Sequence, residues 1–68
     1  MHTVELRIER YNHTATTKSM LVDLAFLPRQ GETVAVWNDE DGEHEKYIVT
    51  QVVHFVGDKP TVYLIDPY

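Results

Sequence analysis

The longest strand-like segment of this 68-residue chain is Glu45–Val56, which is rich in Val, Ile, Tyr and Phe. Twelve extended residues span about 40 Å, which is longer than a compact chain of this size is wide. A strand over this segment must therefore bend. Gln51 is the polar residue that interrupts the apolar face of the segment, and we predict the bend or a bulge at this position. A long bent strand shared by two halves of a sheet is what a small barrel needs to close.

Four other segments also have the pattern of strands. Thr3–Tyr11 alternates apolar with polar side chains, as a half-buried strand does. Met20–Leu27 fits a short helix or a strand by periodicity, and we favour a strand because the segment is short and Pro28 ends it. Thr33–Trp37 and Thr61–Asp66 complete the set. We therefore predict an all-β fold, a five-stranded antiparallel meander that closes into a small SH3-like or Sm-like barrel with a long bent fourth strand.

Turn residues separate these segments and set the expected register. Asn12–Lys18 and Leu27–Glu32 are expected to be loops or turns. We expect Asp41-Gly42 and Asp58-Lys59 to form two-residue turns, whose twist matches that of the strands they join. These turns give the following cross-strand pairs: Val36 with Tyr47, Val34 with Val49, Phe55 with Val62, Val53 with Leu64, His54 with Tyr63, and Val52 with Ile65.

This register divides the side chains between two faces of the sheet. We assign the following residues to the core: Val4, Leu6, Ile8, Val34, Val36, Tyr47, Val49, Val53, Phe55, Val62 and Leu64. The opposite face carries Ala35, Trp37, Lys46, Ile48, Thr50, Val52, His54, Tyr63 and Ile65. That second face is more apolar than a solvated face should be. It could be covered by the same chain, by a second copy, or by a partner or ligand, and a bulge would exchange part of the two faces.

Composition favours self-association. A single domain over residues 1–68 buries only about 60% of the surface of its unfolded chain, so its core is small. The chain has no cysteine for a disulfide and no cluster of metal ligands in its sequence. Oligomerisation is the remaining common way to stabilise so small a domain, and we expect a homo-oligomer.

Charge and hydropathy argue against two classes of partner. The net charge is −5, and much of it lies in the acidic stretch Asp39–Glu45, which opposes binding to a phosphate backbone. We therefore do not expect nucleic-acid binding. No apolar segment is long enough to span a membrane, and the N-terminal residues lack the apolar core of a signal peptide. We expect a cytoplasmic protein.

No group of residues has the spacing of a catalytic or metal site. The four histidines, at positions 2, 13, 44 and 54, are not spaced as ligand pairs. The single serine, Ser19, lies outside any nucleophile motif. We expect no catalytic residues, no metal and no cofactor, and hence no enzyme. His54 lies within an apolar strand, where it is either a packed residue or a ligand contact.

Two segments, LPRQGETV at 27–34 and YIVTQVVH at 47–54, resemble a pattern found in small uncharacterised proteins of bacteria and their phages. Those proteins look like SH3-like or Sm-like barrels, so the resemblance implies the same fold and a bacterial cell, with the gene carried by the bacterium or by a phage. It implies no activity. Among the matching positions, Arg29, Glu32 and His54 are those that packing explains least, and we take them as candidate binding residues.

The leading hypothesis is a non-enzymatic interaction module that self-associates and binds a protein partner. Its interface would comprise Ala35, Trp37, Ile48, Val52 and Ile65. The alternative is a counter-defence protein of phage type that blocks a host defence protein or sequesters a small nucleotide. It would use Arg29, Trp37 and His54. The full set of candidate binding residues is Arg29, Glu32, Trp37, His54 and Tyr63. A third hypothesis, an acidic mimic of nucleic acid, rests only on the Asp39–Glu45 stretch.

Overall fold

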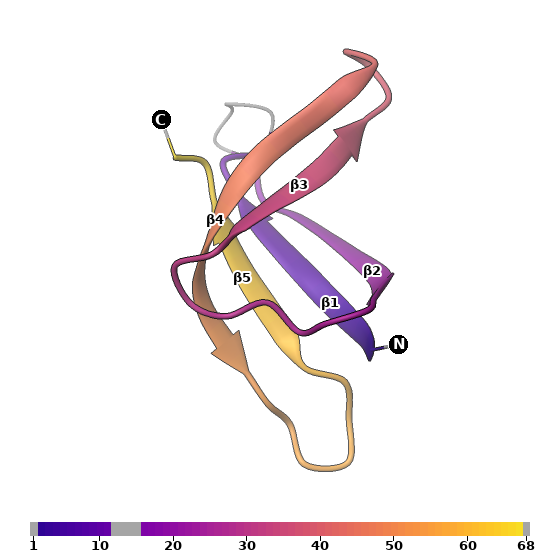
Figure 1. Ribbon diagram of the computed structural model, residues 1–68, viewed down its shortest axis with the longest axis vertical. Helices are drawn as coiled ribbons and strands as arrows, with labels where there is room; N and C mark the ends of the chain where they lie inside the picture. Colours follow the sequence, from indigo (N-terminus) through magenta and orange to yellow (C-terminus); the bar gives the residue numbers. More distant parts are fainter. Residues whose placement is uncertain (1, 12–15, 68) are drawn as a thin grey trace.

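The structure, a computed structural model, describes residues 2–11 and 16–67. It is all-β, with five strands in one sheet in the spatial order β2-β1-β5-β4-β3. The strands are β1 (His2–Glu9), β2 (Lys18–Leu24), β3 (Thr33–Asn38), β4 (Glu43–Val53) and β5 (Thr61–Ile65). Figure 1 shows the sheet rolled into a half-barrel, of which β2 and β3 are the two edges.

The sheet is mixed rather than purely antiparallel. β1 and β5 run parallel at its centre, and the other neighbours are antiparallel. The predicted antiparallel meander and closed barrel are therefore wrong, although the all-β class and the five strands are confirmed. Residues 25–32 explain the open form, because they cross from β2 to β3 as a loop (Figure 1) and pack Leu27 against the core. The chain thus covers the core with a loop instead of pairing β2 with β3.

The core lies on the inner face of the half-barrel, because alternate residues of each strand point to that side. Its buried members are Val4, Leu6, Ile8, Val36, Tyr47, Val49, Val62 and Leu64. All eight were assigned to the core from the sequence. Val34, another of the eleven predicted core positions, is half-buried and packs against this cluster, as do residues of β2.

β4 bends at a bulge, as its length predicts. The register shifts between Val49, which lies opposite Leu64, and Gln51, which lies opposite Tyr63. Thr50 is the extra residue, and its hydroxyl donates a hydrogen bond to the carbonyl of Tyr63 at 3.3 Å. The bulge predicted at Gln51 is thus confirmed to within one residue.

The bulge exchanges the two faces of β4 beyond it. Val52 pairs with Val62 and packs against the core, whereas Val53 pairs with Thr61 and Phe55 is 49% exposed. The predicted core positions of Val53 and Phe55 are therefore wrong, and so is the predicted outer position of Val52. One extra residue inverts the alternation of side chains, which accounts for all three differences.

The register of the β3–β4 hairpin also differs from the prediction. Asn38 pairs with Glu43, and Val34 rather than Val36 lies opposite Tyr47. The connection is therefore a four-residue loop over 39–42 instead of a two-residue turn. Because the register moves by two residues, β3 keeps the faces that the sequence predicts.

Asn38 is the physical reason for the longer loop. It is only 2% exposed, and its Oδ1 accepts a hydrogen bond from the backbone N–H of Glu40 at 3.0 Å. Its carbonyl accepts a second hydrogen bond, from the N–H of Gly42 at 2.9 Å. An asparagine that bonds the backbone two residues ahead starts a turn by itself, so the connection begins two residues earlier than predicted.

Two further predictions need correction. The strand expected at Met20–Leu27 is a strand, but it runs over Lys18–Leu24, where Leu24 pairs with the first residue of β1. The β4–β5 connection covers residues 54–60 and is longer than an Asp58-Lys59 turn, because the last pair is Val53 with Thr61. Of the predicted loop Asn12–Lys18, residues 12–15, with His13, lie outside the described residues, and Lys18 is already part of β2.

Candidate functional site

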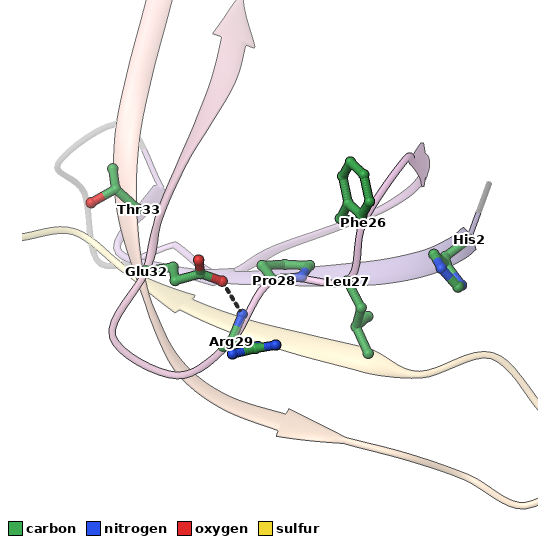
Figure 2. Close-up of a pocket in the computed structure, with 7 residues that line it drawn as sticks. All are labelled: His2, Phe26, Leu27, Pro28, Arg29, Glu32 and Thr33. Atoms are coloured by element: carbon green, nitrogen blue, oxygen red, sulfur yellow. Dashed lines mark hydrogen bonds between the residues drawn. The ribbon is translucent and has the colours of Figure 1, made fainter.

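The turn at residues 29–32 positions two of the candidate binding residues. The N–H of Glu32 donates a hydrogen bond to the carbonyl of Arg29 at 3.1 Å. In turn, Oε1 of Glu32 accepts a hydrogen bond from the backbone N–H of Arg29 at 2.5 Å (Figure 2). Gly31 has a φ of 90°, which glycine adopts without steric cost, and its N–H donates to the carbonyl of Val49 at 2.8 Å. The turn is thus closed on itself and anchored to β4. Glu32 has a structural role in this turn.

Arg29 lies at the junction of two surface hollows. The first, of about 580 Å³, is bordered by His2, Phe26, Leu27, Pro28, Arg29, Glu32 and Thr33 (Figure 2). The second, of about 470 Å³, is bordered by Leu27, Pro28, Arg29, Gln30, Val52 and His54. Arg29 is exposed, and in the described part of the chain no carboxylate lies within ion-pair distance of its guanidinium. This cation is therefore available to an anion from outside the chain.

His54 joins Arg29 instead of Tyr63. Gln51 occupies the position opposite Tyr63, and His54 lies past the end of β4, at the second hollow. The predicted pairing of His54 with Tyr63 is therefore wrong, because the bulge shifts the register and β4 ends at Val53. The structure brings together two of the predicted binding residues, Arg29 and His54.

Tyr63 belongs to a different surface. It lies on the outer face of β5, where the guanidinium carbon of Arg7 is 5.9 Å from the centre of its ring. Arg7 also forms an ion pair with Glu5 at 3.3 Å. Tyr63, Arg7 and Glu5 border a small hollow on this face, and Phe55 borders it too. Tyr63 is thus separated from Arg29 and His54 by the sheet itself.

Four of the five predicted interface residues share the outer face, and we call them the outer patch: Ala35, Trp37, Ile48 and Ile65. Ile48 lies directly opposite Ile65 across β4 and β5. Ala35 and Trp37 are exposed on β3, and Trp37 is 52% exposed. Val52, the fifth predicted residue, is on the inner face and does not belong to the patch.

The ring of Trp37 is held in place by two contacts. Its Nε1–H donates to Oδ1 of Asp39 at 2.7 Å. The ring of His44, its cross-strand partner, packs against it edge to face, with 5.2 Å between ring centres and an interplanar angle of 74°. The single polar atom of the indole is therefore satisfied, and what remains exposed is apolar surface. His44 was not singled out from the sequence, because the predicted register did not place it opposite Trp37.

The acidic hairpin brings three carboxylates together. Ligand oxygens of Asp41, Glu43 and Glu45 lie within 4.8 Å of one another. Oδ2 of Asp41 already accepts a hydrogen bond from Nδ2 of Asn38 at 3.2 Å. The hairpin loop explains this cluster, and it does not by itself define a metal centre.

Phe26 is a candidate contact residue that the sequence did not reveal. It is 86% exposed at the first hollow, and Figure 2 shows its ring on the opposite side of the loop from Leu27. The sequence pattern predicts a strand over both residues. No sequence signal separates the two side chains, because Pro28 follows both of them.

No family model, curated protein or solved structure matches the chain. The resemblance to small bacterial and phage proteins stays a prediction, and the function must be argued from geometry. Within the described residues there is no helix of the length and apolarity needed to cross a bilayer.

Proposed function

We propose that the protein is a non-enzymatic interaction module that self-associates and binds a protein partner through the outer patch. The observation that carries this proposal is the state of Trp37. The ring is half exposed, yet its N–H is already bonded to Asp39 and its orientation is fixed by His44. Tryptophan is among the residues that contribute most to protein interfaces. A ring that is already ordered loses little conformational freedom on binding.

The neighbours of the outer patch support the same function. Across the sheet, Ile65 pairs with Glu9 and Ala35 pairs with Lys46, so an apolar centre is flanked by charged side chains. An apolar centre with a polar rim is the usual organisation of protein interfaces. This arrangement suits a protein surface better than a small ligand, because the patch is part of a sheet face and not a hollow.

The exposed surface of the chain is also larger than its size predicts. Its accessible area is 4787 Å², whereas a folded monomer of 7.9 kDa exposes about 4,400 Å². The extents of 35 × 19 × 19 Å account for part of the excess, because an elongated shape has more surface. Association would remove this excess and add to a small core.

The lone tryptophan makes the proposal directly testable. Sedimentation should give a concentration-dependent mass above that of one chain at micromolar concentrations, and dilution should shift Trp37 emission to the red. Trp37→Ala should raise the dissociation constant about 30-fold, the effect of losing an interface hot spot. Phe26→Ala, a matched loss of an exposed aromatic away from the patch, should change it less than about threefold. A strict monomer at high micromolar concentration would overturn self-association.

A second function is favoured by one specific observation, the meeting of Arg29 and His54 at one hollow. An unpaired guanidinium with an imidazole nearby suits a small anion such as a nucleotide phosphate. Such a site would fit the sequestration of a nucleotide by a counter-defence protein. A nucleotide panel in a thermal-shift assay should then raise the melting temperature of the wild type and not that of His54→Ala. No rise with any nucleotide would remove this second function.

A further inference from the structure

β3 is an edge of the sheet, and among the strands of residues 2–11 and 16–67 its only neighbour is β4. An edge strand presents backbone N–H and C=O groups that no neighbouring strand satisfies, and it can pair with a strand of another chain. β2 forms the other edge. Proteins usually protect such edges with charged side chains, proline or bulges, so the two edges can be compared on this basis.

The β3 edge lacks all three forms of protection. Its sequence, TVAVWN, contains no charged residue and no proline, and its pairing with β4 runs without a break from Thr33 to Asn38. β2 begins with Lys18 and carries Asp23 near its end, and Asp23 accepts a hydrogen bond from Thr3 at 2.6 Å. The β3 edge is therefore the one open to an added strand.

We propose that the added strand is β3 of a second copy, paired antiparallel. This inference rests on the proposed self-association and specifies its geometry. Charge supports the antiparallel direction. Arg29 precedes β3, and the acidic loop that contains Asp39 and Asp41 follows it. In an antiparallel pair, the unpaired Arg29 of each copy lies near the acidic loop of the other.

A parallel pair would have the opposite effect. It would bring the two acidic loops together and the two Arg29 side chains together. In the antiparallel pair the acidic loops are separated by about the length of β3, roughly 20 Å for six residues. That distance exceeds the screening length of about 8 Å at physiological salt. The net charge of −5 therefore hinders antiparallel association much less than its size suggests.

The faces of β3 restrict the register. Directly opposite residues lie on the same face, so a symmetric pair must be centred on one residue. Centring on Ala35 places Val34 opposite the partner's Val36 on the inner face. It also places Thr33 opposite the partner's Trp37 on the outer face, a β-branched residue beside an aromatic one.

The two neighbouring registers are less favourable. Centring on Val36 would place Glu32 opposite the partner's Glu40 and Val34 opposite the partner's Asn38. Centring on Val34 would place Glu32 opposite the partner's Val36. Only the Ala35-centred pair keeps apolar residues together without opposing like charges. It joins two five-stranded sheets into one continuous sheet.

Because the chain has no cysteine, a single introduced thiol tests this geometry. In Ala35→Cys, the two thiols would lie across the symmetry axis, with Cβ atoms about 5 Å apart and close to disulfide distance. We expect oxidation at low micromolar concentration to convert most of this variant to a covalent dimer. Lys46→Cys is the control, because Lys46 is exposed on the same face of β4, one strand further from the edge. Its two thiols would lie about 14 Å apart and should not crosslink.

The outcomes separate this inference from the proposed function. A dimer by sedimentation, with rapid crosslinking of Ala35→Cys and not of Lys46→Cys, supports β3 pairing. A dimer in which Lys46→Cys crosslinks, or in which neither variant does, overturns β3 pairing and leaves self-association intact. A wild type that stays monomeric overturns both. Arg29→Glu should also raise the dissociation constant of the dimer about tenfold above that of the wild type. An unchanged dissociation constant would contradict the antiparallel direction.

Discussion

Trp37 donates its indole hydrogen bond to Asp39, two residues further along the chain, at a distance of 2.7 Å. The exposed ring of Trp37, near the end of β3, is thus oriented by Asp39, the first residue of the acidic loop. The loop therefore has two effects on the proposed association. It supplies charge at the rim of the outer patch, and it orders the aromatic side chain two residues from Ala35, the centre of the proposed β3 pair.

Replacing Asp39 should disorder Trp37 without unfolding the protein. We expect Asp39→Ala to cost about 0.5–1 kcal/mol of stability, because the lost hydrogen bond is exposed. The dissociation constant for self-association should rise about two- to tenfold, since the ring must then be ordered on binding. Fluorescence anisotropy of Trp37 measures the disorder directly.

Glu43→Ala is the control for charge in that experiment. Glu43 is an exposed carboxylate of the same hairpin, and its cross-strand partner is Asn38 and not Trp37. It should leave the anisotropy of Trp37 unchanged. Equal effects of the two variants would mean that charge, and not the hydrogen bond, controls the ring.

The bulge at Thr50 predicts different costs for two adjacent valines. Val52 packs against the core, while Val53 lies on the outer face opposite Thr61. Val52→Ala should therefore reduce the free energy of unfolding by about 1–2 kcal/mol, and Val53→Ala by less than about 0.5 kcal/mol. Urea denaturation of the two variants measures both values. A larger loss for Val53→Ala would show that the strand is regular through Thr50.

Local patterns in the sequence predicted much of the fold. The alternation in Thr3–Tyr11 identified β1 and its buried residues, since period-two burial is a property of the strand alone. The length of the fourth strand predicted its bend, and Gln51 located it. The parallel pairing of β1 with β5 was not predictable in this way. It depends on contacts such as Leu6 with Val62, which are distant in sequence and have no local signal.

The candidate site was harder to predict because small shifts in register move side chains between faces. Arg29 and His54 were chosen separately, and only the bulge shows that they share a hollow. Glu32 was chosen because packing did not explain it, but the hydrogen bond to the N–H of Arg29 does. The face assignment was most accurate for Ala35 and Trp37, because they lie on β3, whose register error was an even number of residues.

Asp58 should titrate below its ordinary range. Its carboxylate accepts a hydrogen bond from the backbone N–H of Lys59 at 2.7 Å, and the Lys59 ammonium is 3.4 Å away. The backbone bond first, and then the ammonium, lower the pKa of Asp58 from its usual 3.8. Because the folded pKa is the lower one, the stabilising effect of the carboxylate is complete above the unfolded pKa and is lost as the pH falls through the folded pKa.

NMR titration of the Asp58 carboxyl carbon measures this shift. We expect a midpoint below 3.8 in the wild type. Lys59→Ala should reduce the shift without abolishing it, because it removes the ammonium and leaves the backbone N–H, the largest single cause, in place. A midpoint at or above 3.8 in the wild type would contradict the hydrogen bond.

Gly31 should be the least replaceable residue of the turn that carries Arg29. Its φ of 90° is strained for any L-residue, and its N–H donates to the carbonyl of Val49. An added Cβ would meet nothing within 4 Å, so Gly31→Ala should cost only the backbone strain, about 1–2 kcal/mol. Thermal or urea unfolding measures this cost.

A chain made by chemical synthesis with D-alanine at position 31 is the control, because a D-residue favours positive φ. It should be at least as stable as the wild type, gaining about 0.4–1 kcal/mol from a less flexible unfolded chain. If L-alanine is tolerated as well as D-alanine, then the turn does not hold Gly31 at positive φ, and the placement of Arg29 beside His54 would have to be abandoned with it.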